Sequence, residues 1–208
     1  MKNKKSLIAL IALAVVGVVG STFAYFTTTQ TFTNTFSTEV YKTVVSETFI
    51  PPTDWQPGDE VDKVVNVKNE GNVPVAVRVK LVQKWVNSLD TELPLQAGAE
   101  NSKFDVAVIN FTNADDWTKN GDWYYYNTIL DTNDTTKPLF ESVTYNSLMT
   151  SELAGIVCET DIDDTTHTTT QTCTSGSGYA GGKYTLEVTV QTVQADAALA
   201  EWGYDPAA

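Results

Sequence analysis

Residues 61–81 decide the fold, and they read Val61-Asp-Lys-Val-Val-Asn-Val-Lys-Asn-Glu-Gly-Asn-Val-Pro-Val-Ala-Val-Arg-Val-Lys-Leu81. On both sides of the turn Asn69–Asn72, apolar residues alternate with polar or small ones, as in strands with one buried face. The apolar rows are Val61, Val65 and Val67 before the turn, and Val73, Val75, Val77, Val79 and Leu81 after it. The stretch predicts a half-buried antiparallel hairpin. Pro74 should lie near a strand start or an edge, because proline removes one ladder donor.

Strand signals recur along the rest of the chain. Pro57-Gly58-Asp59 predicts a tight turn before the hairpin. Further strands are predicted over 43–49, 104–111, 123–130, 139–145 and 184–194, and short helices over 146–155 and 195–202. Residues 83–102 indicate a short helix or an exposed loop, and the Thr-, Asp-, Ser- and Gly-rich segment 158–182 a long loop or a mobile hairpin. The expected fold class is therefore all-β: a jelly-roll-like antiparallel β-sandwich with few short helices, preceded by an N-terminal signal helix.

Composition restricts the partners. The 208 residues carry 13 basic and 26 acidic side chains, a net charge of −13, and Arg78 is the single arginine. Removing an N-terminal segment with three lysines would leave 10 basic residues against 26 acidic ones. Such an acidic chain is not expected to bind nucleic acid or an anionic membrane surface.

Residues 1–24 have the pattern of a signal peptide. Lys2, Lys4 and Lys5 precede the uncharged run Ser6–Ala24. Thr22 at position −3 and Ala24 at position −1 predict cleavage between Ala24 and Tyr25. We therefore expect a protein secreted to the extracellular matrix or cell surface, with one domain over 25–208. Signal peptidase would be a partner during export. An uncleaved signal, the alternative, would be the only membrane attachment.

Residues 25–40 then predict a strand with aromatic side chains on one face. The residues expected to mediate assembly are Phe26, Phe32, Phe36 and Val40. No hairpin partner directly precedes this segment. A strand of this kind at a free N-terminus can pair with another chain, so we expect a donor strand and a head-to-tail homopolymer.

Few residues offer chemistry. Cys158 and Cys173 predict one disulfide in an exported protein, the alternative being two reduced thiols. Two cysteines and the single His167 cannot build the usual zinc sites. Asp161, Asp163 and Asp164 offer oxygen ligands for a hard cation, but they lack the spacing of a known calcium loop, and solvated acidic turns are the favoured interpretation. We therefore expect no catalytic residue, no metal and no cofactor, and hence no enzyme.

An alternative function rests on the aromatic run Trp123–Tyr126, which is suited to stacking against sugars. Alternate residues of a strand face opposite ways, so at most two of the four can share a surface. Packing within and beside the core is the competing explanation. If the sugar interpretation holds, the protein is a monomeric surface adhesin or glycan-binding module.

Three features together resemble the TasA/camelysin family, exported biofilm-matrix fibre proteins with a SipW-type signal peptide. They are the junction Thr22-Phe23-Ala24-Tyr25-Phe26, the turn Pro57-Gly58-Asp59, and the turn Asn69-Glu70-Gly71 between valine-rich strands. The resemblance implies a jelly-roll subunit of pilus-like filaments, in which the N-terminal strand completes the sheet of the next subunit. Camelysin-like members have also been classed as metalloproteases. One histidine and no zincin motif argue against that activity here.

Overall fold

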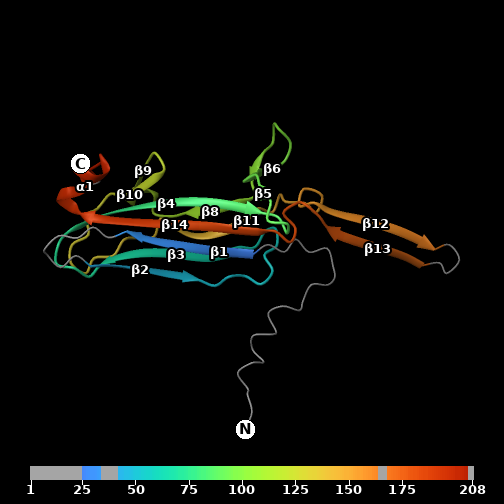
Figure 1. The fold of residues 1–208 in the computed structure, drawn as a ribbon, viewed down its shortest axis with the longest axis horizontal. Coiled ribbons are helices and arrows are strands. Elements are labelled where there is room, and N and C mark those ends of the chain that lie inside the picture. The colour runs from blue at the N-terminus through green and yellow to red at the C-terminus, as the bar shows by residue number, and fades with distance from the viewer. Residues whose placement is uncertain (1–24, 34–41, 164–167, 206–208) are drawn as a thin grey trace, which may run out of the picture.

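Two β-sheets lie face to face in the computed structural model, which describes residues 25–33, 42–163 and 168–205 (Figure 1). The larger sheet has the order β1-β14-β4-β10-β9, with β5 also paired to β4, and the smaller has the order β2-β3-β11-β8. The larger sheet comprises β1 (Tyr25–Thr33), β4 (Val75–Val86), β5 (Glu92–Leu93), β9 (Trp117–Asn120), β10 (Trp123–Tyr126) and β14 (Lys183–Gln194). The smaller comprises β2 (Thr43–Phe49), β3 (Glu60–Asn69), β8 (Ala107–Phe111) and β11 (Phe140–Tyr145). The predicted antiparallel β-sandwich is confirmed.

The hairpin predicted over 61–81 is wrong in its pairing, although both strands and the turn are present. β3 pairs with β2 and β11, whereas β4 pairs with β14, β10 and β5. The chain therefore crosses from one sheet to the other at residues 70–74. Both valine rows are buried because they face one core from opposite sides. Alternation identifies the buried face of a strand but not its neighbour, which explains the error.

The buried side chain of Asn69 holds this crossing. Its Nδ2 donates to Val73 O at 2.8 Å and to Leu130 O at 3.0 Å, and its Oδ1 accepts from Gly71 N at 2.9 Å. These bonds satisfy backbone groups that a hairpin ladder would otherwise pair. Pro74 has no backbone N–H to donate. At the crossing, as at a sheet edge, no ladder hydrogen bond is lost because of this.

An aromatic cluster fills one end of the core. The rings of Trp55, Trp85, Tyr145 and Tyr184 pack with centroids 5.1–5.9 Å apart, and all four side chains are fully buried. Trp55 comes from the turn before β3, and the positive φ of Gly58, 97°, closes that turn. Aromatic rings of this size dominate the apolar area that a sandwich of this length can bury.

Three predicted elements differ from the structure. Residues 104–111 split into β7 (Phe104–Asp105), which pairs with β6 (Gln96–Ala97), and β8, because Val106 N donates to Leu95 O at 2.9 Å. The strand predicted over 123–130 ends at Tyr126. The helix predicted over 146–155 is wrong, since turns occupy that segment. There the Asn146 and Thr150 side chains accept from Leu148 N and Leu153 N, and such local bonds compete with a helix.

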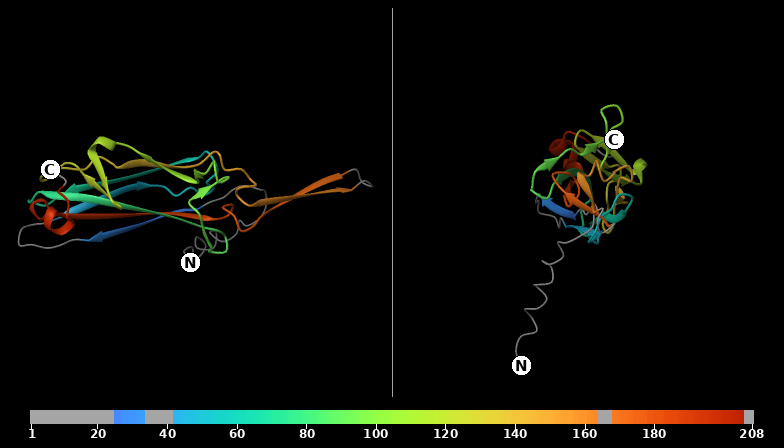
Figure 2. Two further views of the ribbon diagram at one scale, coloured as in Figure 1. Left: turned by 90° about the horizontal axis from the view of Figure 1, so that it is seen from above. Right: turned by 90° about the vertical axis from the view of Figure 1, so that its right-hand side faces the viewer.

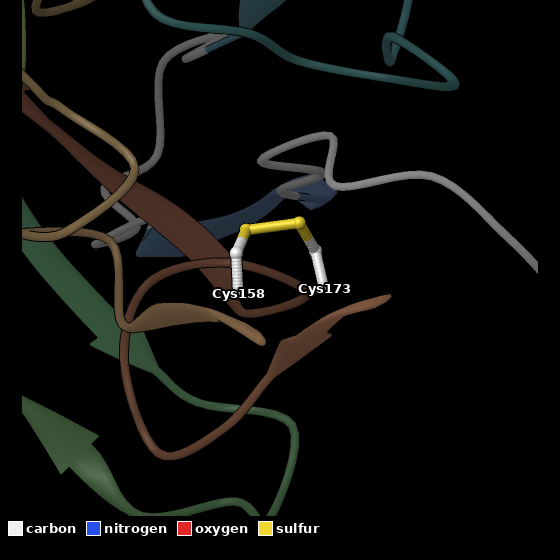
Figure 3. The surroundings of a disulfide bond; sticks show 2 residues. All are labelled: Cys158 and Cys173. Carbon is white, nitrogen blue, oxygen red and sulfur yellow. A yellow bond between two sulfur atoms is a disulfide. The ribbon is translucent and has the colours of Figure 1, made fainter. Parts of the chain in front are cut away.

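The segment predicted as a long loop or hairpin is an antiparallel hairpin, β12 (Ile156–Asp163) and β13 (Thr168–Ser175). It extends from one end of the sandwich, and helix α1 (Ala198–Trp202) lies at the other end (Figures 1 and 2). Cys158 lies opposite Cys173 in the ladder, and their sulfurs form the predicted disulfide (Figure 3). Asp164 and His167 lie outside the described residues.

The C-terminal helical turn is confirmed by the 3-10 turn η3 (Ala195–Ala197) and α1. Ala198 packs with Ala76 and Val193 in a small second core on the outer face of the larger sheet, beside the partly buried Trp202. Within the described ranges, no helix has the length and apolar character needed to span a membrane.

Candidate functional site

The edge of the larger sheet is formed by β1, which pairs in parallel with β14. Nine residue pairs run in unbroken register from Tyr25↔Lys183 to Thr33↔Gln191. On its other side, β14 pairs with β4 over twelve residues. The first described strand of the chain therefore covers what would otherwise be an open edge of β14. An open edge of this length is a template for strand addition.

Tyr184, Leu186, Val188 and Val190 of β14 alternate into the core, as the two-residue period of the predicted strand 184–194 implies. Phe26 and Phe32 are the register partners of Tyr184 and Val190. No hairpin partner precedes β1 in the sequence, but β14, far along the same chain, pairs with it. A pairing between segments some 160 residues apart is not visible in local sequence patterns.

Both ends of the connection between β1 and β2 lie at the same end of β14. Thr33 pairs with Gln191, and Thr43 Oγ1 lies 3.1 Å from the Oγ1 of Thr192. Eight residues, 34–41, separate β1 from Lys42. The described residues on either side of this connection therefore lie close to one end of β14.

Lys42 is fixed to the body at this point. Glu70 N donates to Lys42 O at 2.8 Å, and Lys42 Nζ lies 2.8 Å from Glu70 Oε2. The Lys42 ammonium is the main cause that lowers the pKa of the Glu70 carboxyl. The ion pair is exposed and contributes little stability, whereas the backbone bond marks where the body begins.

The predicted site residues divide between described and undescribed parts of the chain. Tyr25, Phe26 and Phe32 belong to β1, and Cys158 and Cys173 form the disulfide. Ala24, Phe36 and Val40 lie outside the described residues, as does the whole predicted signal segment. The cleavage position and the donor role stay predictions.

One buried charged group was missed in the sequence. Lys63 on β3 has no exposed side-chain surface and contacts the Glu47 carboxylate on β2. Period-two alternation places Lys63 in the inward row with Val61 and Val65, and that parity is the signal that could have revealed it. Burial lowers the pKa of the Lys63 amine, while contact with Glu47 acts in the opposite direction.

An open groove of about 520 Å³ lies beside β4, β8 and β10, away from β1. Its aromatic wall is the ring pair of Phe111 and Tyr124, with centroids 5.4 Å apart. Lys119 Nζ lies 5.2 Å from the Tyr124 ring centroid, and Lys80 pairs with Asp122 at 2.7 Å. The groove therefore combines an aromatic face with charged groups of both signs.

Residues Trp123–Tyr126 alternate between the two faces of the larger sheet, as expected for a strand. Tyr126 is buried in the core, and Tyr124 packs against it while bordering the groove. On the opposite face, the guanidinium of Arg78 lies 4.2 Å from the Trp123 ring centroid and 4.6 Å from that of Trp202. Arg78 also donates to Tyr125 Oη at 3.2 Å. Of the four aromatic residues, only Tyr124 borders the groove.

A family described as camelysin metallo-endopeptidase matches residues 2–196. The chain belongs to the camelysin family. The TasA/camelysin resemblance seen in the sequence is thereby confirmed. No curated protein and no solved structure gives a match.

The description of the camelysin family implies a catalytic metal. Such a metal would need several His, Cys, Asp or Glu side chains close together. Across residues 25–33, 42–163 and 168–205, no three His, Cys, Asp or Glu side chains group closely enough to hold a metal ion. Both cysteines are joined in the disulfide, and the single histidine, His167, lies outside these ranges. The described donors therefore do not fit a zinc-protease centre, and we derive no metal-dependent step.

Proposed function

We propose that this camelysin-family chain is a secreted, non-enzymatic subunit of extracellular matrix fibres. In the fibre, β1 of one copy would take the place beside β14 of the next copy. The observation that carries the proposal is the placement of β1. It is an edge strand, pairs with β14, and is joined along the chain to β2 by residues 34–42.

Strand exchange would preserve the contacts of the closed chain. An incoming β1 would meet the same β14 register and the same buried row, so the nine-pair ladder is available within one copy or between two. Nine connecting residues extend to about 30 Å, which allows β1 to leave its own body. A head-to-tail exchange that does not close into a ring generates a filament.

The proposal is tested by deleting Tyr25–Thr33 from the secreted protein. We expect no filaments by electron microscopy, because β14 loses its donor. A synthetic peptide of residues 25–33 should bind the truncated protein, and a scrambled peptide of the same composition should not. Filaments that form as well as those of the full protein would refute the donor role of β1.

The groove beside Tyr124 favours a second candidate, a glycan-binding adhesin. Sugar rings stack on exposed aromatic faces, and the Lys80–Asp122 pair offers hydrogen bonds beside the Tyr124 ring. Glycan-array binding that is lost in Tyr124→Ala and retained in Trp123→Ala, on the opposite face, would support it. Binding that is absent in the unmodified protein would rule it out.

A further inference from the structure

Lys63 occupies an unusual place for a lysine. Among the lysines that the structure describes, it is the one that is fully buried. Its side chain enters the sandwich from β3, in the inward row formed by Val61, Val65 and Val67. Lysine is almost never buried unless it is paired. The chain therefore holds a primary amine where water does not reach it.

A carboxyl group lies in contact with this amine. Glu47 lies on the neighbouring strand β2, where the register pairs Glu47 with Val65 and Phe49 with Lys63. The Glu47 side chain is 17% exposed, and Lys63 Nζ contacts Glu47 Oε1. The Phe49 ring lies over the amine, with its centroid 4.9 Å from Nζ. Amine and carboxyl are thus held together under an aromatic cover.

This environment favours the reactive, neutral form of the Lys63 amine. Burial disfavours the ammonium and lowers the pKa of Lys63. When the proton passes from the ammonium to the carboxylate, the pair becomes a neutral amine beside a neutral carboxylic acid. Well-oriented groups within one molecule reach effective concentrations on the order of 10⁵–10⁸ M, which is the advantage of holding the amine against the carboxyl.

We propose that Lys63 and Glu47 condense into an intramolecular isopeptide bond that links β3 to β2. A bond forms between Lys63 Nζ and Glu47 Cδ, and a Cδ–O bond breaks. The departing hydroxyl takes one proton from the nitrogen, so one water molecule leaves. The step consumes no oxidant, reductant or cofactor.

The bond would fasten β2 at the edge of the smaller sheet. β2 follows the connection from β1, so it is the strand that receives any pull transmitted through residues 34–42. Its only strand partner among the described residues is β3, and a covalent link would stop β2 from peeling away. The inference does not depend on strand exchange between copies.

The test is the intact mass of the purified full-length or mature protein, measured after reduction of the Cys158–Cys173 disulfide. We expect a mass lower than that of its sequence by one water molecule. Peptide mapping should recover the segment containing Glu47 linked to the segment containing Lys63. A mass equal to that of the sequence, with the two segments recovered separately, would overturn the proposal.

Variants of Glu47 and Lys63 test whether these two side chains form the bond. Glu47→Gln should reach the same final mass as the original protein, because ammonia then leaves in place of water and the product is identical. Lys63→Arg should keep the full mass. The matched control is Lys84→Arg, which alters an exposed lysine that lies 3.6 Å from Glu92 and should leave the water loss unchanged. A water loss that persists in Lys63→Arg would contradict the assignment.

Discussion

The indole rings of Trp55 and Trp85 stack with their planes 7° apart and their centroids separated by 5.9 Å. Trp55 precedes β3 in the smaller sheet and Trp85 lies in β4 of the larger, so this contact joins the two layers. We expect Trp85→Ala to lower the free energy of unfolding by about 3–5 kcal/mol, because a large buried ring leaves a cavity. Urea denaturation measures this loss. Trp123→Ala, on the outer face, should cost clearly less, and equal losses would contradict the account.

The crossing between the sheets depends on Asn69. Asn69→Ala removes three hydrogen bonds and leaves the buried Val73 carbonyl and Gly71 amide without the Asn69 side chain as partner, whereas the Leu130 carbonyl keeps its bond from Val75 N. The expected loss is about 2–3 kcal/mol in the free energy of unfolding, measured by urea denaturation. Asn72→Ala, at an exposed position in the same crossing, is the control. A negligible effect of Asn69→Ala would show that the turn needs no side-chain anchor.

Much of this arrangement could be predicted from local patterns. The bounds of β2 match the predicted strand 43–49, and the inward row of β14 is the one that alternation indicated. Both follow from the two-residue period, which is a local property of the chain. The partner of each strand is a non-local property. For this reason the Asn69–Asn72 turn has the local pattern of a hairpin, although Asn69 bonds to Leu130 and turns the chain into the other sheet.

Because two tyrosines are buried, we expect the folded protein to lose stability at alkaline pH. Burial raises the pKa of Tyr145 and of Tyr184 above the ordinary value of 10.0, so the folded protein keeps protons that the unfolded chain loses. Stability is then full below pH 10 and falls as the pH rises further, by about 1.4 kcal/mol per pH unit for each tyrosine. Tyr145→Phe should flatten this decline and change little at pH 7–9. Denaturation curves across about pH 8–11.5 measure it, and an unchanged decline would show that burial of Tyr145 is not its cause.

The disulfide should stabilise the β12–β13 hairpin rather than the sandwich. The hairpin extends from the body, and a lone two-stranded ribbon is marginally stable in water (Figure 2). The double change Cys158→Ser and Cys173→Ser should speed hydrogen exchange in 156–163 and 168–175. Exchange in β4 and β14 should stay unchanged. A uniform increase across the sandwich would show that the hairpin supports the whole fold.

The candidate site was predicted in part. The sequence identified β1 as a strand, but its parallel pairing with β14 joins the two ends of the chain and has no local signature. Lys63 was missed because a lysine is ordinarily taken as exposed, although its parity within β3 places it inward. The helical spacing over 146–155 gave a wrong prediction. The side chains of Asn146 and Thr150 accept hydrogen bonds from nearby backbone N–H groups, and these bonds compete with a helix.

The central claim is that β1 of one copy can occupy the place beside β14 of another. Thr29 and Glu187 are register partners, and adjacent strands bring such positions close enough for a disulfide. Copies carrying Thr29→Cys should be mixed with copies carrying Glu187→Cys under oxidising, filament-forming conditions. The account predicts disulfide-linked pairs of copies, and no such link when Glu92→Cys replaces Glu187→Cys. If the mixture gives no link between copies while the double variant closes readily within one chain, β1 stays in its own sheet and the account is contradicted.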